Sequence, residues 1–215
     1  CTAQLNGATR GNVRFARNDV STAGVTDDIQ LAVQVAFGKR VGTATINQFD
    51  DASLQRVVRR AEELARLAPE NPEFMPAVPQ QTYLKTNTFS APTAAIDPAY
   101  RAKVASDSIG PCRAENLVAA GYLEDQAGFV AFMNSKGNYG YQTSTSSDYT
   151  CTVRTPDGRG SGWVGHNVQD VAQFNAGEDI RVAMRKASAS AGAQALEPGK
   201  YTVILEPAAA AGLVA

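Results

Sequence analysis

The single histidine, His166, limits the metal and acid–base chemistry that this chain could perform alone. A zinc site around it would need cysteine or carboxylate ligands at suitable spacing. Cys151 lies fifteen residues upstream, and the chain has no HExxH pair. A Ser-His-Asp triad would also need His166, yet no serine stands in a G-x-S-x-G turn. We therefore interpret His166 as a turn residue at a strand end, and we predict no catalytic residue and no metal ligand in this chain.

Two other patterns have non-catalytic interpretations. The glycine-rich stretch 158–165 lacks the Lys-Ser or Lys-Thr and the following helix of a phosphate loop. Its glycines lead into a segment containing Trp163, which indicates a hairpin turn with close backbone packing. The adjacent acids Glu62 and Glu63 fall on the polar side of a helical pattern, and nothing sets them opposite other carboxylates. We interpret them as a solvated face.

The most distinctive turn, Asn134-Ser-Lys-Gly-Asn-Tyr-Gly, is the remaining candidate for a binding site. Its glycine can supply the positive φ of a hairpin loop. The same loop could present backbone groups to a peptide at the rim of a groove, and turn chemistry leaves both interpretations open. The candidate substrate-binding residues are Asn134, Ser135, Gly137 and Tyr139.

Composition narrows the class of protein. A chain of 215 residues with 44% hydrophobic content can bury the core of one large domain or two small lobes. A net charge of −1 argues against nucleic acid, which is usually bound by a basic stripe. No apolar run approaches the roughly 20 residues of a membrane span. The few, scattered cysteines (Cys1, Cys112 and Cys151) predict reduced thiols in a cytoplasmic protein.

The elements that would position these residues begin with a sheet and a helix. Alternating residues predict strands over 13–18 and 29–37, and Gly38-Lys39 reverses the chain into a third strand over 40–46. Apolar residues at three- and four-residue spacing then predict an amphipathic helix from Asp50 or Asp51 to Ala68. This helix should lie across one face of the hairpin.

The middle and second half differ in pattern. Six of the ten prolines fall in 69–98, which predicts an extended connector, followed by a helix from Asp97-Pro98 to about Ile109. Later residues alternate with period two and predict an antiparallel meander, with turns at 125–128 and 147–148 and a helix over 177–192. The predicted strands of the meander are 117–124, 128–134, 139–146, 149–155 and 161–164.

The sequence thus predicts an α+β fold of two antiparallel sheet-plus-helix lobes of similar plan, joined by a proline-rich connector. The predicted units are a lobe at 1–68, the connector and helix at 69–110, and a lobe at 111–195. Residues 196–215 contain a β-rich run and a helix start at Pro207. We interpret them as the start of a truncated C-terminal domain, and Cys1 as a fragment boundary.

Several of these stretches, taken in order, resemble the PmbA/TldD family, which is also described as modulators of DNA gyrase. Each motif is weak alone, but the ordered set spans nearly the whole chain. The resemblance runs through Val13-Arg-Phe-Ala-Arg-Asn, Gly38-Lys-Arg-Val-Gly-Thr-Ala-Thr-Ile-Asn, Ala61-Glu-Glu-Leu-Ala-Arg, Ala119-Ala-Gly-Tyr, Asn134-Ser-Lys-Gly, Ser161-Gly-Trp and Leu196-Glu-Pro-Gly-Lys-Tyr-Thr-Val-Ile-Leu-Glu-Pro.

The resemblance implies a two-subunit, zinc-dependent peptidase that processes or degrades peptides. In that family one subunit carries a helical HExxxH motif and its partner lacks it. Glu206-Pro-Ala-Ala after Val203-Ile-Leu resembles the metal-free PmbA/TldE type. Zinc is then expected on the partner subunit or in the missing C-terminal domain, and no family metal ligand can be assigned to this sequence.

This part would shape the substrate chamber and the subunit contacts. Its expected partners are a TldD-like subunit or a second copy of itself, and an extended peptide held at strand edges. Neither nucleic acid nor membrane is expected. Two alternatives stay open: a non-enzymatic regulatory module of the gyrase-modulator kind, or the N-terminal half of the metal-bearing subunit itself.

Overall fold

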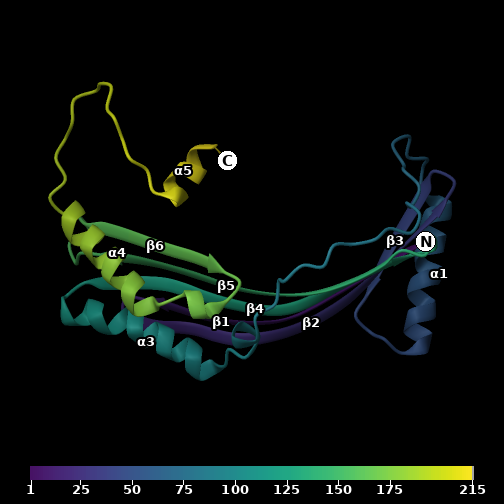
Figure 1. Ribbon diagram of the computed structural model, residues 1–215, viewed down its shortest axis with the longest axis horizontal. Coiled ribbons are helices and arrows are strands. Elements are labelled where there is room, and N and C mark those ends of the chain that lie inside the picture. The colour runs from purple at the N-terminus through teal and green to yellow at the C-terminus, as the bar shows by residue number, and fades with distance from the viewer. Residues whose placement is uncertain (215) are drawn as a thin grey trace.

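The computed structural model describes residues 1–214, in which one six-stranded antiparallel sheet carries helices at both of its ends (Figure 1). The strand order across the sheet is β3-β2-β1-β4-β5-β6. The strands span Thr2–Ala16 (β1), Asp19–Phe37 (β2), Arg40–Ile46 (β3), Val118–Asn134 (β4), Tyr139–Arg154 (β5) and Ser161–Val168 (β6).

Four long strands connect the two ends. β1, β2, β4 and β5 contain 15, 19, 17 and 16 residues. At about 3.3 Å per residue each spans about 50 Å or more. Figure 1 shows them as a curved ribbon. β1 and β2 are joined through Arg17 and Asn18, which both have positive φ, at 53° and 61°. This is the backbone of a tight hairpin turn that matches the sheet's twist.

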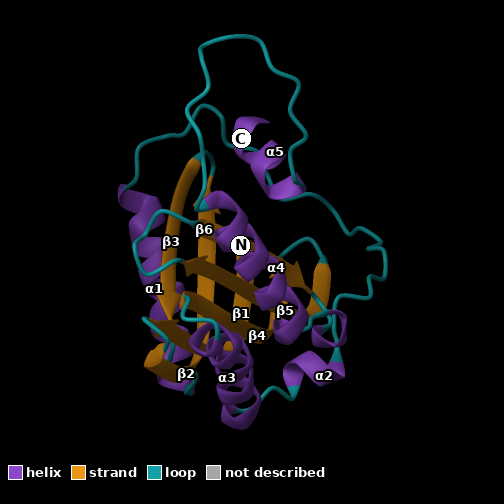
Figure 2. Ribbon diagram, turned by 90° about the vertical axis from the view of Figure 1, so that its left-hand side faces the viewer, coloured by secondary structure: helices purple, strands orange, loops and turns teal. Residues whose placement is uncertain are grey.

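The long helices pack at opposite ends. α1 (Asp51–Leu67) contacts β2 and β3, whereas α3 (Pro98–Ala114) and α4 (Ala176–Ser190) contact each other and the strands at the far end. Figure 2 shows α3 and α4 next to each other across that end, and the chain after α4 looping away before α5 (Pro207–Val214). Two short helical pieces complete the fold: α2 (Ala91–Ala94) and the 3-10 helix η1 (Val171–Gln173).

The register places all three long helices on one face of the sheet. Val33, which packs against α1, lies opposite Ala3 of β1. Val13, in the core with α3, stands an even number of residues further along β1, so it points to the same side. We call this side the helix face and the other side the open face.

The core is divided unevenly between the two ends. Beneath α3 and α4 lies a cluster of 18 buried residues that includes Phe15, Leu123, Tyr149 and Ile180. Beneath α1 the buried cluster consists of Val33, Val35, Val57 and Ala61. The larger cluster should supply most of the hydrophobic stabilisation.

The α+β class is confirmed, as are the hairpin of β2 and β3 and the helix after Asp50. The two helix-covered ends nevertheless share one sheet, because four strands run through both. The turns predicted at 125–128 and 147–148 are wrong: β4 and β5 pair without interruption from Val118 to Met133. A continuous ladder satisfies every backbone group there, which outweighs the local turn preference. The domain boundaries at residues 68, 110 and 195 stay predictions.

The β-rich run in 201–205 does not form a strand: residues 196–206 form neither helix nor strand. The segment lies against no strand that could supply ladder hydrogen bonds, and Val203 and Ile204 are exposed. Among residues 1–214, no helix has the length and apolar character needed to cross a membrane.

Candidate functional site

The predicted binding residues lie at the turn between β4 and β5. The Asn134 Oδ1 atom accepts hydrogen bonds from the backbone N–H groups of Lys136 at 2.9 Å and Asn138 at 3.2 Å. Gly137 has a φ of 87°. The Ser135 N–H donates to the Cys1 carbonyl at 2.9 Å, and its Oγ accepts from the terminal amine at 3.1 Å. These three residues build the turn and hold Cys1. Their role in substrate binding stays a prediction.

Asn138, which the sequence did not single out, attaches the connector to this turn. Its side chain is buried and makes four hydrogen bonds. The amide donates to the carbonyls of Val78 and Pro79, both at 2.7 Å. The Oδ1 accepts from the Gln81 N–H at 2.7 Å and from the Tyr83 hydroxyl at 3.2 Å. A buried amide satisfied in this way fixes its surroundings, because any displacement leaves polar groups unpaired.

A second attachment lies further along the connector, at Thr88. The Thr145 N–H donates to the Thr88 carbonyl at 2.9 Å, and the Thr88 hydroxyl donates to the Thr143 carbonyl at 2.8 Å. The Ser90 N–H also donates to Thr145 Oγ1 at 2.9 Å. The connector therefore follows the part of β5 that β6, which pairs only with Ser147 to Arg154, leaves uncovered.

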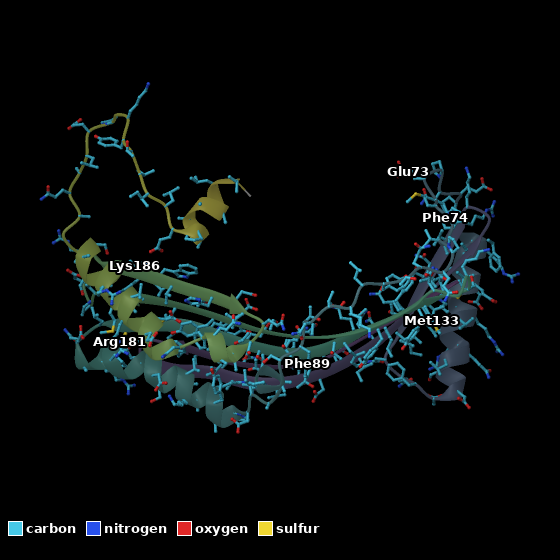
Figure 3. All side chains as sticks on the ribbon, in the orientation of Figure 1. Glu73, Phe74, Phe89, Met133, Arg181 and Lys186 are labelled. Carbon is cyan, nitrogen blue, oxygen red and sulfur yellow. The ribbon has the colours of Figure 1, made fainter. Side chains whose placement is uncertain are left out.

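A groove opens between these attachments, with a volume of about 1040 Å³. We call it the connector groove. Tyr139, one of the predicted residues, lies in its wall and is 62% exposed. Phe89 and Met133 in Figure 3 mark the positions between which the groove runs. Its lining consists of residues 81–89 of the connector, residues 139–143 of β5, Val130 and Phe132.

The connector groove combines aromatic walls with a stretch of β5 that has no second strand beside it. Five of its residues are aromatic, and residues 139–143 of β5 pair with β4 on one side only. An unpaired edge can accept an added strand, and flanking pockets then select alternate side chains. Tyrosine suits such a wall because its ring is apolar and its hydroxyl can hydrogen-bond. The aromatic residues are Tyr83, Phe89, Phe132, Tyr139 and Tyr141.

His166 pairs with a part of β5 that does not line the connector groove. His166 belongs to β6, opposite Tyr149, and its Nε2 atom is 2.9 Å from Oδ1 of Asp179 in the first turn of α4. It therefore lies within a strand, not at a turn. Within residues 1–214, no three side chains of the metal-ligating kinds gather at one place, so these residues do not fit a zinc ion.

The two internal cysteines lie in the large core. Burial raises the pKa of Cys112 to about 12 and that of Cys151 to about 11. Both thiols are free and stay protonated at neutral pH, which makes them poor nucleophiles. Cys1 is exposed.

Fold and site together describe a long antiparallel sheet with the connector groove along one edge. Residues 5–65 match the family described as PmbA/TldA metallopeptidase domain 1. This match and the structural similarities below make the chain similar to an N-terminal domain of the PmbA/TldD family. No curated protein matches the chain in sequence.

Three solved structures share the fold. TldE from Thermococcus kodakarensis superposes with a TM-score of 0.80 at 13% identity, over 87% of this chain and 43% of that chain. A proposed modulator of a DNA gyrase from Thermotoga maritima gives 0.82 at 12%, over 92% and 46%. A proposed modulator of DNA gyrase from Bacteroides thetaiotaomicron gives 0.78 at 14%, over 93% and 48%. The chain thus spans less than half the length of each.

Proposed function

We propose that this chain is the N-terminal part of a subunit of a two-component, zinc-dependent peptidase. In this role it holds an extended peptide and contacts the partner subunit, and it contributes no catalytic residue of its own. The zinc would belong to the partner subunit or to the remainder of the polypeptide. The observation that carries the proposal is the connector groove, where aromatic side chains line an unpaired strand edge.

The geometry of the groove supports an extended ligand. Its two ends are defined by Asn138 and Thr88, which hold the connector against the sheet. Between them, residues 139–142 of β5, which lack a second neighbouring strand, offer backbone groups at strand spacing, about 3.3 Å per residue. A peptide in this groove would be held mainly by its main chain. Such binding tolerates many sequences, as a peptide-processing system requires.

Charge and chemistry agree with a holding role. The net charge of −1 offers no field for nucleic acid. His166 is paired with Asp179, and Cys112 and Cys151 are buried. The groove itself is lined by aromatic, amide and hydroxyl side chains and contains one ionisable amine, Lys85. These groups suit recognition.

The test is a cleavage assay with the whole polypeptide, a metal-bearing PmbA/TldD-type partner and an unfolded peptide. Truncation of Tyr139 and Tyr141 to alanine should raise KM about tenfold and leave kcat unchanged, because the lost contacts hold substrate and transition state equally. Tyr201→Ala, on an exposed tyrosine outside the groove, is the matched control. The proposal fails if the partner cleaves the peptide equally well without this protein.

Two of the structural relatives favour a second candidate, a regulatory module, since they are described as proposed modulators of DNA gyrase. A supercoiling assay with purified gyrase separates this candidate from the first. The regulatory function predicts altered supercoiling when the whole polypeptide is added without a peptidase partner. The third candidate, the metal-bearing subunit, predicts a His-Glu-x-x-x-His motif in the parent sequence after residue 215.

A further inference from the structure

The other edge of the sheet contains a long strand segment without a second neighbour. β3 pairs only with Leu31 to Phe37 of β2, whereas β1 pairs with β2 along its whole length. Residues 19–30 of β2 therefore have a partner on one side only, and all twelve are exposed. We call this segment the free edge. Alternate residues of an antiparallel strand direct their N–H and C=O groups away from the existing partner, so the free edge presents a row of unpaired backbone groups.

The two edges of the sheet differ in how much of each is covered by other parts of the chain. On β5, β6 pairs with Ser147 to Arg154, and Thr88 of the connector is hydrogen-bonded to Gln142, Thr143 and Thr145. No described element covers residues 19–30. Native proteins usually shorten, bend or cover an edge of this length, because an exposed one pairs with other chains.

Three large apolar side chains and Asp27 lie on the helix face of the free edge. Val20, Val25 and Ile29 are exposed by 48%, 51% and 43%. Their register partners on β1 are Phe15, Gly11 and Gly7, which all occupy helix-face positions of that strand. A row of exposed apolar side chains along an unpaired strand is a feature of an association site.

A cavity adjoins this row, between the free edge and the start of α3. It has a volume of about 310 Å³ and lies against Val13, Val20 and Val25 of the sheet and Pro98 and Ala102 of α3. Arg101 also borders it, but its guanidinium is bound to Asp125 at 2.6 and 2.7 Å. A strand added to the free edge would direct every second side chain to the helix face. One of these side chains would lie at the cavity, which has room for one large apolar group.

The charge of the free edge indicates the kind of strand that fits. Residues 19–30 contain three acids, Asp19, Asp27 and Asp28, and no lysine, arginine or histidine. Asp27 accepts a hydrogen bond from the Thr9 hydroxyl at 2.5 Å. A second copy of this chain would add three more acids along the shared edge, whereas a basic strand would place opposite charges beside the acids already there. Opposite charges on directly paired residues stabilise a sheet, and like charges destabilise it.

We propose that the free edge of β2 binds an extended segment of a different polypeptide by strand addition. That segment places one large apolar side chain in the cavity beside α3 and a lysine or arginine next to Asp27 or Asp28. This site lies on the opposite edge of the sheet from the connector groove, so it does not depend on the proposed peptidase function.

The probe is a fluorescein-labelled ten-residue peptide of alternating valine and lysine, and its binding to the 215-residue chain is followed by fluorescence anisotropy. Two matched peptides are controls: one with glutamate in place of every lysine, and one with its two central residues replaced by proline, which cannot pair as a strand. We expect saturable binding of the first peptide and at least tenfold weaker binding of both controls.

Variants locate the site. All variants are made in a Tyr139→Ala, Tyr141→Ala background, which removes two walls of the connector groove, and the valine–lysine peptide should still bind this background. In it, Val25→Lys and Asp28→Lys should each weaken binding about tenfold or more, whereas Val58→Lys, on the exposed side of α1, should leave binding unchanged. Circular dichroism checks that each variant is folded. Three results would overturn the proposal: no binding of the valine–lysine peptide, equal binding of the proline peptide, or loss of binding in the Tyr139→Ala, Tyr141→Ala background. A dimer in sedimentation velocity that Val25→Lys dissociates would assign the edge to a second copy, and would overturn it too.

Discussion

At each end of the sheet, a helix packs directly on an edge strand at a glycine of that strand. At one end, a Cβ atom on Gly42 of β3 would collide with the backbone of α1. At the other end, a Cβ atom on Gly162 of β6 would collide with the backbone of α4. In both helices the contacting positions are fully buried alanines four residues apart, so each helix backbone rests directly on its strand. These pairs are Ala61 with Ala65, and Ala183 with Ala187.

The two ends differ in the size of the hydrophobic core beneath the helix. α4 shares a core of 18 buried residues with α3 and four strands, whereas α1 covers a cluster of four. Local unfolding free energies follow the number of buried contacts, so α1 should open more readily than α4. The attachment of the connector at Asn138 lies toward the α1 end of the sheet, because the adjacent Asn134 pairs with Thr2, which pairs with Gln34 of β2. The connector groove therefore adjoins the end that we expect to open more readily.

The largest expected effect tests the core at the α3 end. Arg101 and Asp125 form a two-pronged ion pair with both side chains less than 10% exposed. Arg101→Met would leave Asp125 buried without its partner, and should lower the free energy of unfolding by about 3–5 kcal/mol in urea titrations. The control is Arg60→Met on α1, which breaks an exposed pair with Glu63 and should cost less than about 1 kcal/mol. Equal costs would contradict the contrast between the ends.

The next prediction compares Gly42 and Gly162, the glycines on which α1 and α4 pack. Gly162→Ala and Gly42→Ala should each push a helix outward, at a cost of about 1–3 kcal/mol. Because α4 belongs to the main core, Gly162→Ala should lower the global stability measured by urea. Gly42→Ala should instead accelerate hydrogen exchange in α1 and leave exchange in α3 and α4 unchanged. If Gly42→Ala accelerates exchange throughout the molecule, the two ends unfold as one unit.

Thiol labelling provides a third and smaller readout of the same contrast. Cys1 is exposed and should react at once with a thiol reagent at pH 8. Cys112 and Cys151 should react only when the α3 end opens, because burial raises the pKa of both thiols. Gly162→Ala should therefore speed their labelling, and Gly42→Ala should not. Rapid reaction of all three cysteines in the unmodified chain would contradict the buried core.

The smallest effect is a pH dependence confined to α1. Asp50 caps this helix, and hydrogen bonds from the Ser53 side chain and backbone N–H hold its pKa below the ordinary 3.8. A lowered carboxyl pKa means that the cap stabilises the helix above pH 3.8, and that this contribution is lost as the pH falls through the lowered pKa. Hydrogen exchange in α1 should rise over that acid range. Asp50→Asn, which caps without titrating, should remove this pH dependence.

Local signals were sufficient for the elements in which pattern and packing agree. The turn at Gly38-Lys39 and the helix after Asp50 have their own turn and cap residues and an apolar face that meets a core. The long strands could not be predicted in the same way. Residues 2–12 of β1 and 19–28 of β2 lack the expected alternation, because a helix covers little of the sheet there. Their conformation depends on the neighbouring strands, which supply the ladder hydrogen bonds.

In the candidate site, too, some residues could be predicted from the sequence and others could not. The turn around Gly137 was recognisable from its residues, and the sequence singled out Tyr139. The roles of Asn138, Tyr83 and Thr88 were not, because the connector carries no periodic signal and reaches β5 only after the chain has folded back. A composition rich in proline indicates an extended segment, but it does not indicate which strand that segment follows.

By itself, the sequence determined the class of fold, the helices with their caps, the tightest turns and the resemblance to the PmbA/TldD family. These depend on residues close together in the chain or on ordered motifs. Only the tertiary structure decided that the strands form one continuous sheet, that the connector covers one edge, and that residues 19–30 leave the other edge free. Backbone hydrogen bonds between distant strands carry no side-chain signature, so the pairing that creates both edges becomes visible only in three dimensions.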